Sequence, residues 1–261
     1  MRQQYVGEPE GRLVGRVNRA EEARQPFAPA LRELGERSRP GAGASTAGCS
    51  ATPATAATAR DRLGADSLAG MRLVDLGCGY GGLAALFAFH GAHVVAVDPN
   101  RERLATVARV AERHALDLRP THGRMERLDL PDASFDVAVM NNSFVYLVDS
   151  ELRRRALAAA RRVLAPGGVL VMCNANRLYP IDQFSGLPLI QLLPPAAAVR
   201  AAGLLGRRRS LCRPRSPHVT RGELRAAGFA ETVHHPTTDR LPRAPRIVAR
   251  YTHLSALRQP M

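Results

Sequence analysis

The chain lacks several residue types and patterns, and each absence narrows what it can be. Its 261 residues include no Lys and no Trp, and only 7 Phe and 5 Tyr supply aromatic rings. No run of 18 apolar residues occurs, because the longest candidate, residues 186–206, is interrupted by Gln191, the adjacent Pro194 and Pro195, and Arg200. The first residues contain acids and no apolar stretch. We therefore expect neither a membrane-spanning helix nor a secretory signal.

Cysteine is also scarce. Cys49, Cys78, Cys173 and Cys212 lie far apart and form no CxxC pair. Scattered thiols in a chain of this length predict a reduced, cytoplasmic protein rather than one held by disulfides. No acidic cluster or His/Cys set has the spacing of a metal site, so no metal is expected.

The positive charge is unevenly placed. Every basic residue is Arg, and residues 1–150 hold 18 Arg against 18 acids, whereas residues 151–261 hold 19 Arg against 5 acids. The net charge of +14 therefore lies entirely in the later part of the chain, where an anionic partner would bind. Codon preference explains the choice of Arg over Lys, but not the scarcity of acids after position 150.

Low complexity at the start gives way to regular alternation. Residues 1–60 form a predicted flexible extension that ends in a linker of small residues, 39–60. From residue 61 onward short apolar runs alternate with helical periodicity, which predicts one α/β domain over 61–261. The expected strands are 71–76, 93–97, 116–121, 135–140, 169–173, 229–233 and 246–251, and the expected helices are 83–90, 101–114, 151–164 capped by Ser150, and one opened by a Thr220–Glu223 capping box.

Alternating strands and helices predict a doubly wound, mostly parallel sheet, here of seven strands, covered on both faces. Residues 177–217 interrupt the alternation with Pro, Gly and Arg after the fifth strand. Ligands of such sheets bind at the carboxyl ends of the strands, so this insertion is placed to form a lid.

A glycine-rich stretch between the first strand and first helix carries the chemistry. Gly77, Gly79 and Gly82 satisfy GxGxxG, and Asp98 ends the next strand. Taken alone, this pattern is equally compatible with binding of a nicotinamide or flavin cofactor. Asp75, two residues before the first Gly, favours instead a cofactor that bears cations, because its carboxylate would repel a pyrophosphate.

Four stretches in order, VDLGCGYGG, VVAVDPN, GRMERLDLPDASFDVAVMNNSFVYLVD and RRVLAPGGVLVM, resemble the class I S-adenosylmethionine-dependent methyltransferases, within their type 11-like group. The resemblance covers about residues 61–176 and, more weakly, 227–229. It implies that S-adenosylmethionine is the cofactor and that the fold is the Rossmann-like methyltransferase fold.

Residue by residue, the resemblance implies a cofactor site. Gly77, Cys78 and Gly79 would pass beneath the methionine portion, Asp75 would lie near its amino group, and Asn141 would face the same group. Asp98 would bind the ribose, with Pro99 and Asn100 beside the adenine and Arg124 and Met125 bracketing the ring. Relatives usually carry an acid where this chain has Arg124, so adenine recognition would fall to the Met125 backbone.

The acceptor side is less defined by the sequence. Tyr146 occupies a position where many relatives have a His near the substrate, and it is the predicted substrate-positioning residue. The other candidates for a base are His122 and the His234–His235 pair. From the expected lid, Asn176, Arg177 and Tyr179 are the predicted substrate-binding residues.

The apolar stretch 187–205 followed by Arg207, Arg208 and Arg209 has two interpretations. It is either a buried lid helix with a solvated basic end or a surface that associates peripherally with an anionic membrane. Nucleic acid is not an expected partner, because the basic region has few aromatics and no recognisable binding module.

The predicted function is methyl transfer to the O or N of a small-molecule or lipid-linked acceptor. The alternatives are an RNA or protein methyltransferase that uses the basic C-terminal part, and a cofactor-binding partner protein without activity. A nicotinamide oxidoreductase is the least favoured.

Overall fold

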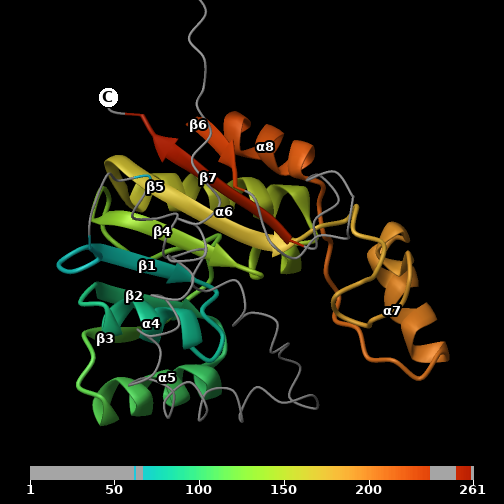
Figure 1. Ribbon diagram of the computed structural model, residues 1–261, viewed down its shortest axis with the longest axis horizontal. Coiled ribbons are helices and arrows are strands. Elements are labelled where there is room, and N and C mark those ends of the chain that lie inside the picture. The colour runs from blue at the N-terminus through green and yellow to red at the C-terminus, as the bar shows by residue number, and fades with distance from the viewer. Residues whose placement is uncertain (1–61, 63–66, 236–250, 260–261) are drawn as a thin grey trace, which may run out of the picture.

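The computed structural model describes residues 62, 67–235 and 251–259, and Figure 1 shows them as a twisted sheet with helices on both faces. The expected N-terminal extension, 1–60, lies outside the described residues. In chain order the elements are β1 (Arg72–Leu76), α4 (Gly82–Phe89), β2 (His93–Asp98), α5 (Arg101–Arg113), β3 (Leu118–His122), β4 (Phe135–Asn141), η3 (Phe144–Tyr146), α6 (Ser150–Val163), β5 (Leu164–Ala175), η4 (Ile190–Leu192), α7 (Pro195–Leu204), α8 (Pro217–Ala226), β6 (Phe229–His234) and β7 (Tyr251–Arg258).

The sheet has seven strands in the order β3-β2-β1-β4-β5-β7-β6, which confirms the predicted fold class. β1 lies parallel to β2 and β4, while β7 runs antiparallel to both β5 and β6. Leu73 of β1 pairs with Val94 on one side and Val137 on the other. Because the first five strands are parallel, the residues that follow β1, β2, β4 and β5 meet at one edge of the sheet.

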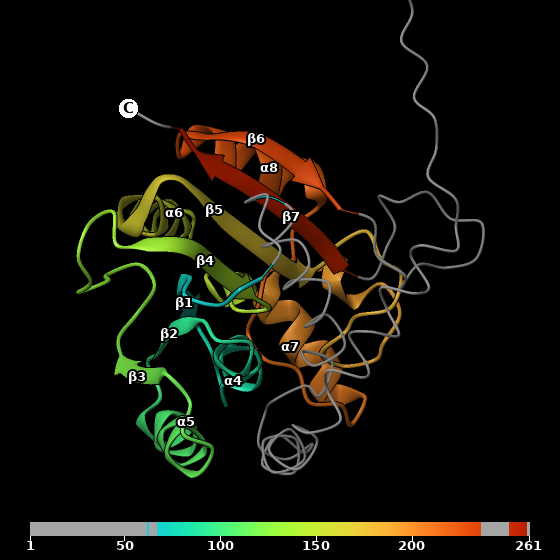
Figure 2. The ribbon, with the colours of Figure 1, turned by 60° about the vertical axis from the view of Figure 1, so that its left-hand side comes forward.

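Alternation along each strand divides the core into two layers. Leu73 and Val94 face α4 and α5, whereas Val74 and Leu76 face α6 and α8. Figure 2 shows α4 and α6 on opposite sides of the strands. Strands buried on both faces need continuous apolar runs, which is why the Val- and Leu-rich segments could be recognised in the sequence.

Two helix caps differ from the predictions. Asp149, rather than Ser150, caps α6, because its carboxylate accepts from the N–H groups of Glu151 and Leu152 at 2.8 and 3.0 Å. Ser216, rather than Thr220, caps α8, since the Ser216 hydroxyl accepts from the Val219 N–H and Thr220 lies within the first turn. At α6 the two candidates are adjacent, and at α8 they lie one turn apart. In both cases the residue types cap about equally well, and the path of the preceding chain selects between them.

The last strand extends seven residues beyond its predicted end at Tyr251. A strand was expected at 246–251, but β7 begins at Tyr251 and runs to Arg258, and residues 246–250 lie outside the described residues. β7 pairs with β5 from Ala175↔Tyr251 to Val169↔Leu257. The long-range pairing with β5 sets the register, and the local residue pattern does not contain it.

The insertion, residues 177–217, folds as η4 and α7 with connecting loops. In Figure 1 the arrowheads of β1, β4 and β5 point toward the side on which α7 lies, so the insertion stands at the carboxyl edge of the sheet. Arg213 N–H donates to the Val145 carbonyl at 2.7 Å, and Asn176 bridges to Arg215, which fasten the insertion to the sheet. Among the described helices none is both long and apolar enough to cross a bilayer.

Candidate functional site

The glycine loop after β1 folds back over the end of β2. The N–H groups of Gly77 and Cys78 both donate to the Val97 carbonyl, at 2.8 and 3.0 Å. Gly77 has φ +79° and Gly79 has φ +59°, which are backbone conformations that favour glycine. A Cβ at Gly77 would lie 2.4 Å from the Cβ of Ser143, whereas a Cβ at Gly79 would meet no atom within 4 Å. Gly77 is therefore required by packing, and the space above Gly79 is open.

Ser143 is a site residue that the sequence analysis missed. Its hydroxyl donates to the Leu76 carbonyl at 2.6 Å, which ties the turn after β4 to the end of β1. It is buried against the glycine loop although 66 residues separate it from Gly77 in the chain. No local pattern marks such a residue, because its partner is a backbone carbonyl on another strand.

Asp98 ends β2 and is 3% exposed. Its Oδ2 accepts from the Gly79 N–H and its Oδ1 from the Asn100 N–H, each at 2.9 Å. The Asn100 side chain in turn accepts from Arg103 N–H at 3.1 Å and caps α5. One carboxylate thus organises both the glycine loop and the start of α5.

Asp75 lies beneath the same loop and is 2% exposed. Burial, reinforced by the negative charge of Asp98, raises the pKa of the Asp75 carboxyl to about 7. Burial and the same two acids raise the pKa of the Cys78 thiol well above its usual range, so it stays neutral. Among the described residues the structure gives Asp75 no ion-pair partner.

Two buried carboxylates at the ends of adjacent strands fit a ligand that brings positive charge and hydroxyl donors. An amino or sulfonium group would relieve the desolvation of Asp75, and hydroxyl groups can donate to the remaining lone pairs of Asp98. The open space over Gly79 leaves room for such a ligand. The residues predicted to hold S-adenosylmethionine are therefore compatible with it.

Arg103, which the sequence analysis did not single out, borders this site. Its guanidinium lies 3.9 Å from Asp98 Oδ1 and 5.7 Å from the centroid of the Tyr80 ring. It is the third residue of α5, and the cap at Asn100 aims that first turn toward Asp98. The arrangement places a cation and an aromatic ring at the outer side of the glycine loop.

The remaining predicted cofactor residues fall into two groups. Met125 reaches the glycine loop, since its Cε would lie 3.0 Å from a Cβ on Gly77, and Asn141 is the last residue of β4. Arg124 is exposed and pairs with Glu126 at 3.4 Å. Pro99 is exposed, and its carbonyl lies 3.1 Å from His122 Nε2.

Tyr146 lies where the glycine-loop site meets the insertion. It ends η3, is 44% exposed, and its ring packs edge-on to Phe184 of the insertion with centroids 6.0 Å apart. Burial of the hydroxyl raises the pKa of Tyr146 above its ordinary value, and the positive charge of Arg103 partly offsets the rise. At neutral pH its phenol is therefore a hydrogen-bond donor rather than a base.

Arg153 of α6 supports η3 from within the core. Its guanidinium donates to Glu223 of α8 at 2.6 and 2.8 Å, and to the carbonyls of Phe144 and Leu147 at 3.2 and 3.3 Å. It also lies 4.0 Å from the centroid of the Phe144 ring. Arg153 thus fixes the backbone on both sides of Tyr146.

The predicted substrate residues mainly hold the insertion together. The Asn176 side chain accepts from the Leu178 N–H at 3.0 Å, and Arg177 donates to the Leu192 carbonyl at 2.7 Å. Tyr179 is half-buried, and its carbonyl accepts from Gln191. All three lie in the segment that leaves β5 at the carboxyl edge of the sheet.

The histidines considered as bases are engaged elsewhere. His122 contacts the Pro99 carbonyl, as described above, and His235 follows β6 and lies 2.7 Å from the Ser255 hydroxyl. β6 and β1 are separated in the sheet by β4, β5 and β7. His234 and His235 are therefore remote from the glycine loop.

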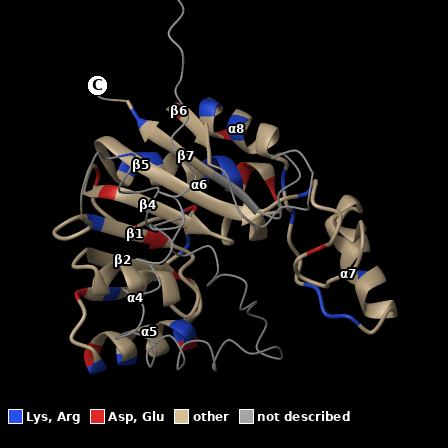
Figure 3. Ribbon diagram, viewed as in Figure 1, with Lys and Arg blue, Asp and Glu red and all other residues tan. Residues whose placement is uncertain are grey.

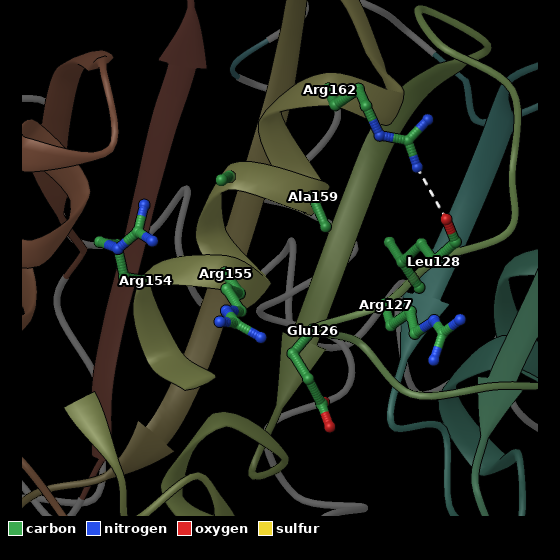
Figure 4. A pocket seen from close by; sticks show the side chains of 8 residues that line it. Glu126, Arg127, Leu128, Arg154, Arg155, Ala159 and Arg162 are labelled. Atoms are coloured by element: carbon green, nitrogen blue, oxygen red, sulfur yellow. Dashed lines mark hydrogen bonds between the residues drawn. The ribbon is translucent and has the colours of Figure 1, made fainter. Parts of the chain in front are cut away.

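Two surface hollows formed by described residues lie beside α5 and beside α6. The first, of about 420 Å³, is lined by Tyr80 of the glycine loop and by the first turns of α5. The other, of about 300 Å³, lies between α6 and the segment after Met125 (Figure 4). It is rich in Arg, but Arg162 donates to the Leu128 carbonyl, drawn as a dashed line, and Arg154 and Arg155 pair with Glu151. None of the predicted site residues lines this second hollow.

Comparisons with known proteins bear on this arrangement. Residues 73–168 match a family model described as a methyltransferase domain. A ubiquinone biosynthesis O-methyltransferase of Roseobacter denitrificans is 40% identical over 119 residues, which cover 45% of this chain and 46% of the relative. The chain thus spans about half the length of that relative.

Solved structures share the fold at low identity. A methyltransferase of Thermotoga maritima matches with a TM-score of 0.56 and 20% identity over 79% of this chain and 89% of the other. The 1,6-didemethyltoxoflavin-N1-methyltransferase of Burkholderia thailandensis, solved with S-adenosylhomocysteine bound, matches with a TM-score of 0.55 and 18% identity over 98% and 93%.

Proposed function

We propose that the chain, whose residues 73–168 match a methyltransferase-domain family model, is a class I S-adenosylmethionine-dependent methyltransferase that transfers a methyl group to an oxygen or nitrogen of a small-molecule or lipid-linked acceptor. The observation that carries the proposal is the pair of buried carboxylates, Asp75 and Asp98, at the ends of β1 and β2 around an open glycine loop. Relatives whose names describe O-methylation support the chemical class of the acceptor.

The residues that would hold the cofactor follow from their places. Asp75 would lie near the amino group and Asp98 near the ribose hydroxyls. Gly77, Cys78 and Gly79 would pass beneath the methionine portion, which the open space at Gly79 can admit. Met125 and Asn141 would border the bound cofactor, with Pro99 and Arg124 on its exposed side. When bound, S-adenosylmethionine supplies a methyl group already activated by its sulfonium.

The protein contributes mainly orientation to such a reaction. Holding the acceptor in line with the methyl group lowers the barrier by several kcal/mol without a covalent intermediate. Tyr146 and Phe184 provide an aromatic wall between the glycine loop and the insertion, and the protonated phenol can donate to an acceptor oxygen. Asn176, Arg177 and Tyr179 would act by placing the insertion beside that wall.

The proposal is tested by ligand binding and by turnover. Isothermal titration of the full chain with S-adenosylhomocysteine, NAD and NADP should give heat only with the first, and binding of NAD alone would refute the proposal. Asp98→Ala should abolish that binding. Asp129→Asn, which removes an exposed acid of the same type, is the matched control and should leave binding unchanged.

Transfer from radiolabelled S-adenosylmethionine to a panel of phenols, amines and quinone precursors then separates the alternatives. An enzyme acting on small molecules labels members of the panel. Labelling of RNA or protein instead would favour the alternative that uses the basic C-terminal part. Cofactor binding without transfer to any acceptor would favour a partner protein without activity.

A further inference from the structure

Large apolar side chains are exposed mainly in one part of the molecule. Of the twelve such side chains among the described residues, eight belong to the insertion, residues 177–217, and the other four are scattered over the rest. Leu204 and Leu205, at the end of α7, are 88% and 65% exposed, more than any other large apolar side chain in the described part of the chain. The eight are Leu178, Ile181, Leu189, Leu192, Leu193, Leu204, Leu205 and Leu211.

The same segment carries a strong positive charge. It contains seven Arg and one acid, Asp182. Asp182 is 1% exposed and is neutralised by Arg209, whose Nε lies 3.2 Å from its Oδ2. Arg200, Arg207 and Arg208 are exposed beside the leucines. Figure 3 shows arginine, in blue, on α7 and on the adjoining loop.

The exposed leucines stand on a folded support. Asp182 accepts from the N–H and hydroxyl of Ser185 as well as from Arg209. Ile190, Ala198 and Ala202 pack into a small core of their own beneath α7. Because η4 and α7 are held from inside, the apolar residues on the outside remain exposed rather than turning inward.

We propose that this surface, formed by the eight exposed apolar residues together with Arg200, Arg207 and Arg208, docks on an anionic lipid bilayer. Leu204 and Leu205 enter the boundary between headgroups and acyl chains, and the three arginines contact lipid phosphates. Charge complementarity favours this occupant, because the insertion holds seven arginines and a single acid, Asp182, which pairs with Arg209. Exposed apolar side chains beside such a net positive charge complement an anionic interface better than the mixed charges of an average protein surface would.

Docking has a consequence for the site. The insertion stands at the carboxyl edge of the sheet, and its Phe184 touches Tyr146. A bilayer bound to the insertion therefore lies on the same side of the molecule as the aromatic wall formed by Tyr146 and Phe184. Docking itself does not rest on the proposed methyl transfer, because none of the cofactor residues belongs to the docking surface.

The experiment is co-sedimentation of the full chain with vesicles. Vesicles of phosphatidylcholine alone are compared with equimolar phosphatidylcholine and phosphatidylglycerol, at low and at physiological salt. Binding is expected only to the anionic vesicles, and failure to sediment with them overturns the proposal. Removing one basic residue near an anionic surface should weaken binding roughly fivefold.

Two double variants and two matched controls test whether the exposed leucines and arginines of the insertion bind the vesicles. Leu204→Ser with Leu205→Ser, and Arg207→Ser with Arg208→Ser, should each reduce the bound fraction by at least about tenfold. Arg119→Ser with Arg225→Ser removes the same charge from β3 and α8, and Val219→Ser with Val233→Ser removes exposed apolar groups elsewhere. Both controls should bind as the wild type does.

Three other results would contradict the docking proposal. If the charge control binds as weakly as the insertion variants, only the overall net charge attracts the vesicles and the surface is wrong. If the leucine variant binds normally, the tip of α7 does not enter the bilayer. A dimer seen without lipid by sedimentation velocity, and lost in the leucine variant, would assign the surface to a second copy of the chain.

Discussion

The Oδ2 atom of Asp98 accepts a hydrogen bond from the backbone N–H of Gly79 at 2.9 Å. The end of β2 and the loop after β1 are therefore joined by one side chain before any ligand binds. Since Asp98 also accepts from Asn100, the loop and the first turn of α5 depend on the same carboxylate. The two glycines of this loop, Gly77 and Gly79, nevertheless serve different purposes, and substitution can distinguish them.

Gly77→Ala should mainly reduce stability, and Gly79→Ala should mainly reduce ligand affinity. Both alanines suffer a positive φ, which costs about 1–2 kcal/mol. At Gly77 the new methyl group also overlaps Ser143, at a further cost of about 1–3 kcal/mol. At Gly79 it enters the open space proposed for the cofactor. Urea unfolding and titration with S-adenosylhomocysteine measure the two effects, and equal losses in both variants would contradict the assignment.

Asp75 makes stability depend on pH. Its pKa is raised from 3.8 to about 7 in the folded protein, so folding favours the protonated carboxyl. The free energy of unfolding should therefore fall as pH rises from about 4 to about 7, by up to about 4 kcal/mol. Asp75→Asn should remove this dependence. Urea unfolding at a series of pH values measures it, and parallel curves for wild type and variant would refute the prediction.

The same group should couple ligand binding to pH. An ammonium near Asp75 favours the ionised carboxylate, so the affinity for S-adenosylhomocysteine should rise as pH increases through about 7. Binding near neutral pH should release a proton. Titrations in two buffers of different ionisation enthalpy detect that proton, and equal heats in both buffers would place the ammonium elsewhere.

Arg153→Met should destabilise the protein by about 3 kcal/mol, because it leaves Glu223 and two carbonyls without their donor. Arg154→Met is the matched control, since Arg154 is exposed and pairs with Glu151 on the surface, and it should have little effect. Chemical unfolding compares the two. Equal stability of the two variants would show that the buried guanidinium contributes nothing beyond its packing.

Tyr146→Phe keeps the ring against Phe184 and removes the hydroxyl. If the phenol donates to the acceptor, the KM for the acceptor should rise and kcat should fall, together lowering kcat/KM by roughly tenfold, while affinity for S-adenosylhomocysteine stays unchanged. Tyr146→Ala should be worse, because it also removes the aromatic contact. Unchanged steady-state constants in Tyr146→Phe would mean that only the ring matters.

The parts of the fold that could be predicted are those that a local residue pattern indicates. β1, β2, β4 and β5 are buried on both faces, so each is a continuous apolar run that can be recognised in the sequence. The choice of Asp149 and Ser216 as caps depends on the path of the preceding chain, and the register of β7 depends on its pairing with β5, neither of which the local residue pattern reveals. Where two polar residues of similar capping strength stand side by side, propensity cannot choose between them.

The candidate site divides in the same way. Asp75 and Asp98 lie at the carboxyl ends of β1 and β2, and the glycines directly follow β1, so the sheet topology brings them together at one edge. Ser143 and Arg103 act through a backbone carbonyl and through a carboxylate on another element, and no spacing marks them. The docking surface could be anticipated only as one of two alternatives, since exposure is a property of the folded insertion.

Arg153 also limits how small a working unit of this protein can be. The segment that matches the methyltransferase family model ends at residue 168, whereas the carboxylate that neutralises Arg153 belongs to Glu223. A fragment restricted to residues 73–168 would keep the guanidinium and the carbonyls around Tyr146 but lose the counter-charge. This ion pair therefore constrains evolutionary exchange of the C-terminal region, because it joins that region to the segment that matches the family model. Any replacement of the C-terminal region must supply another acid that can neutralise Arg153.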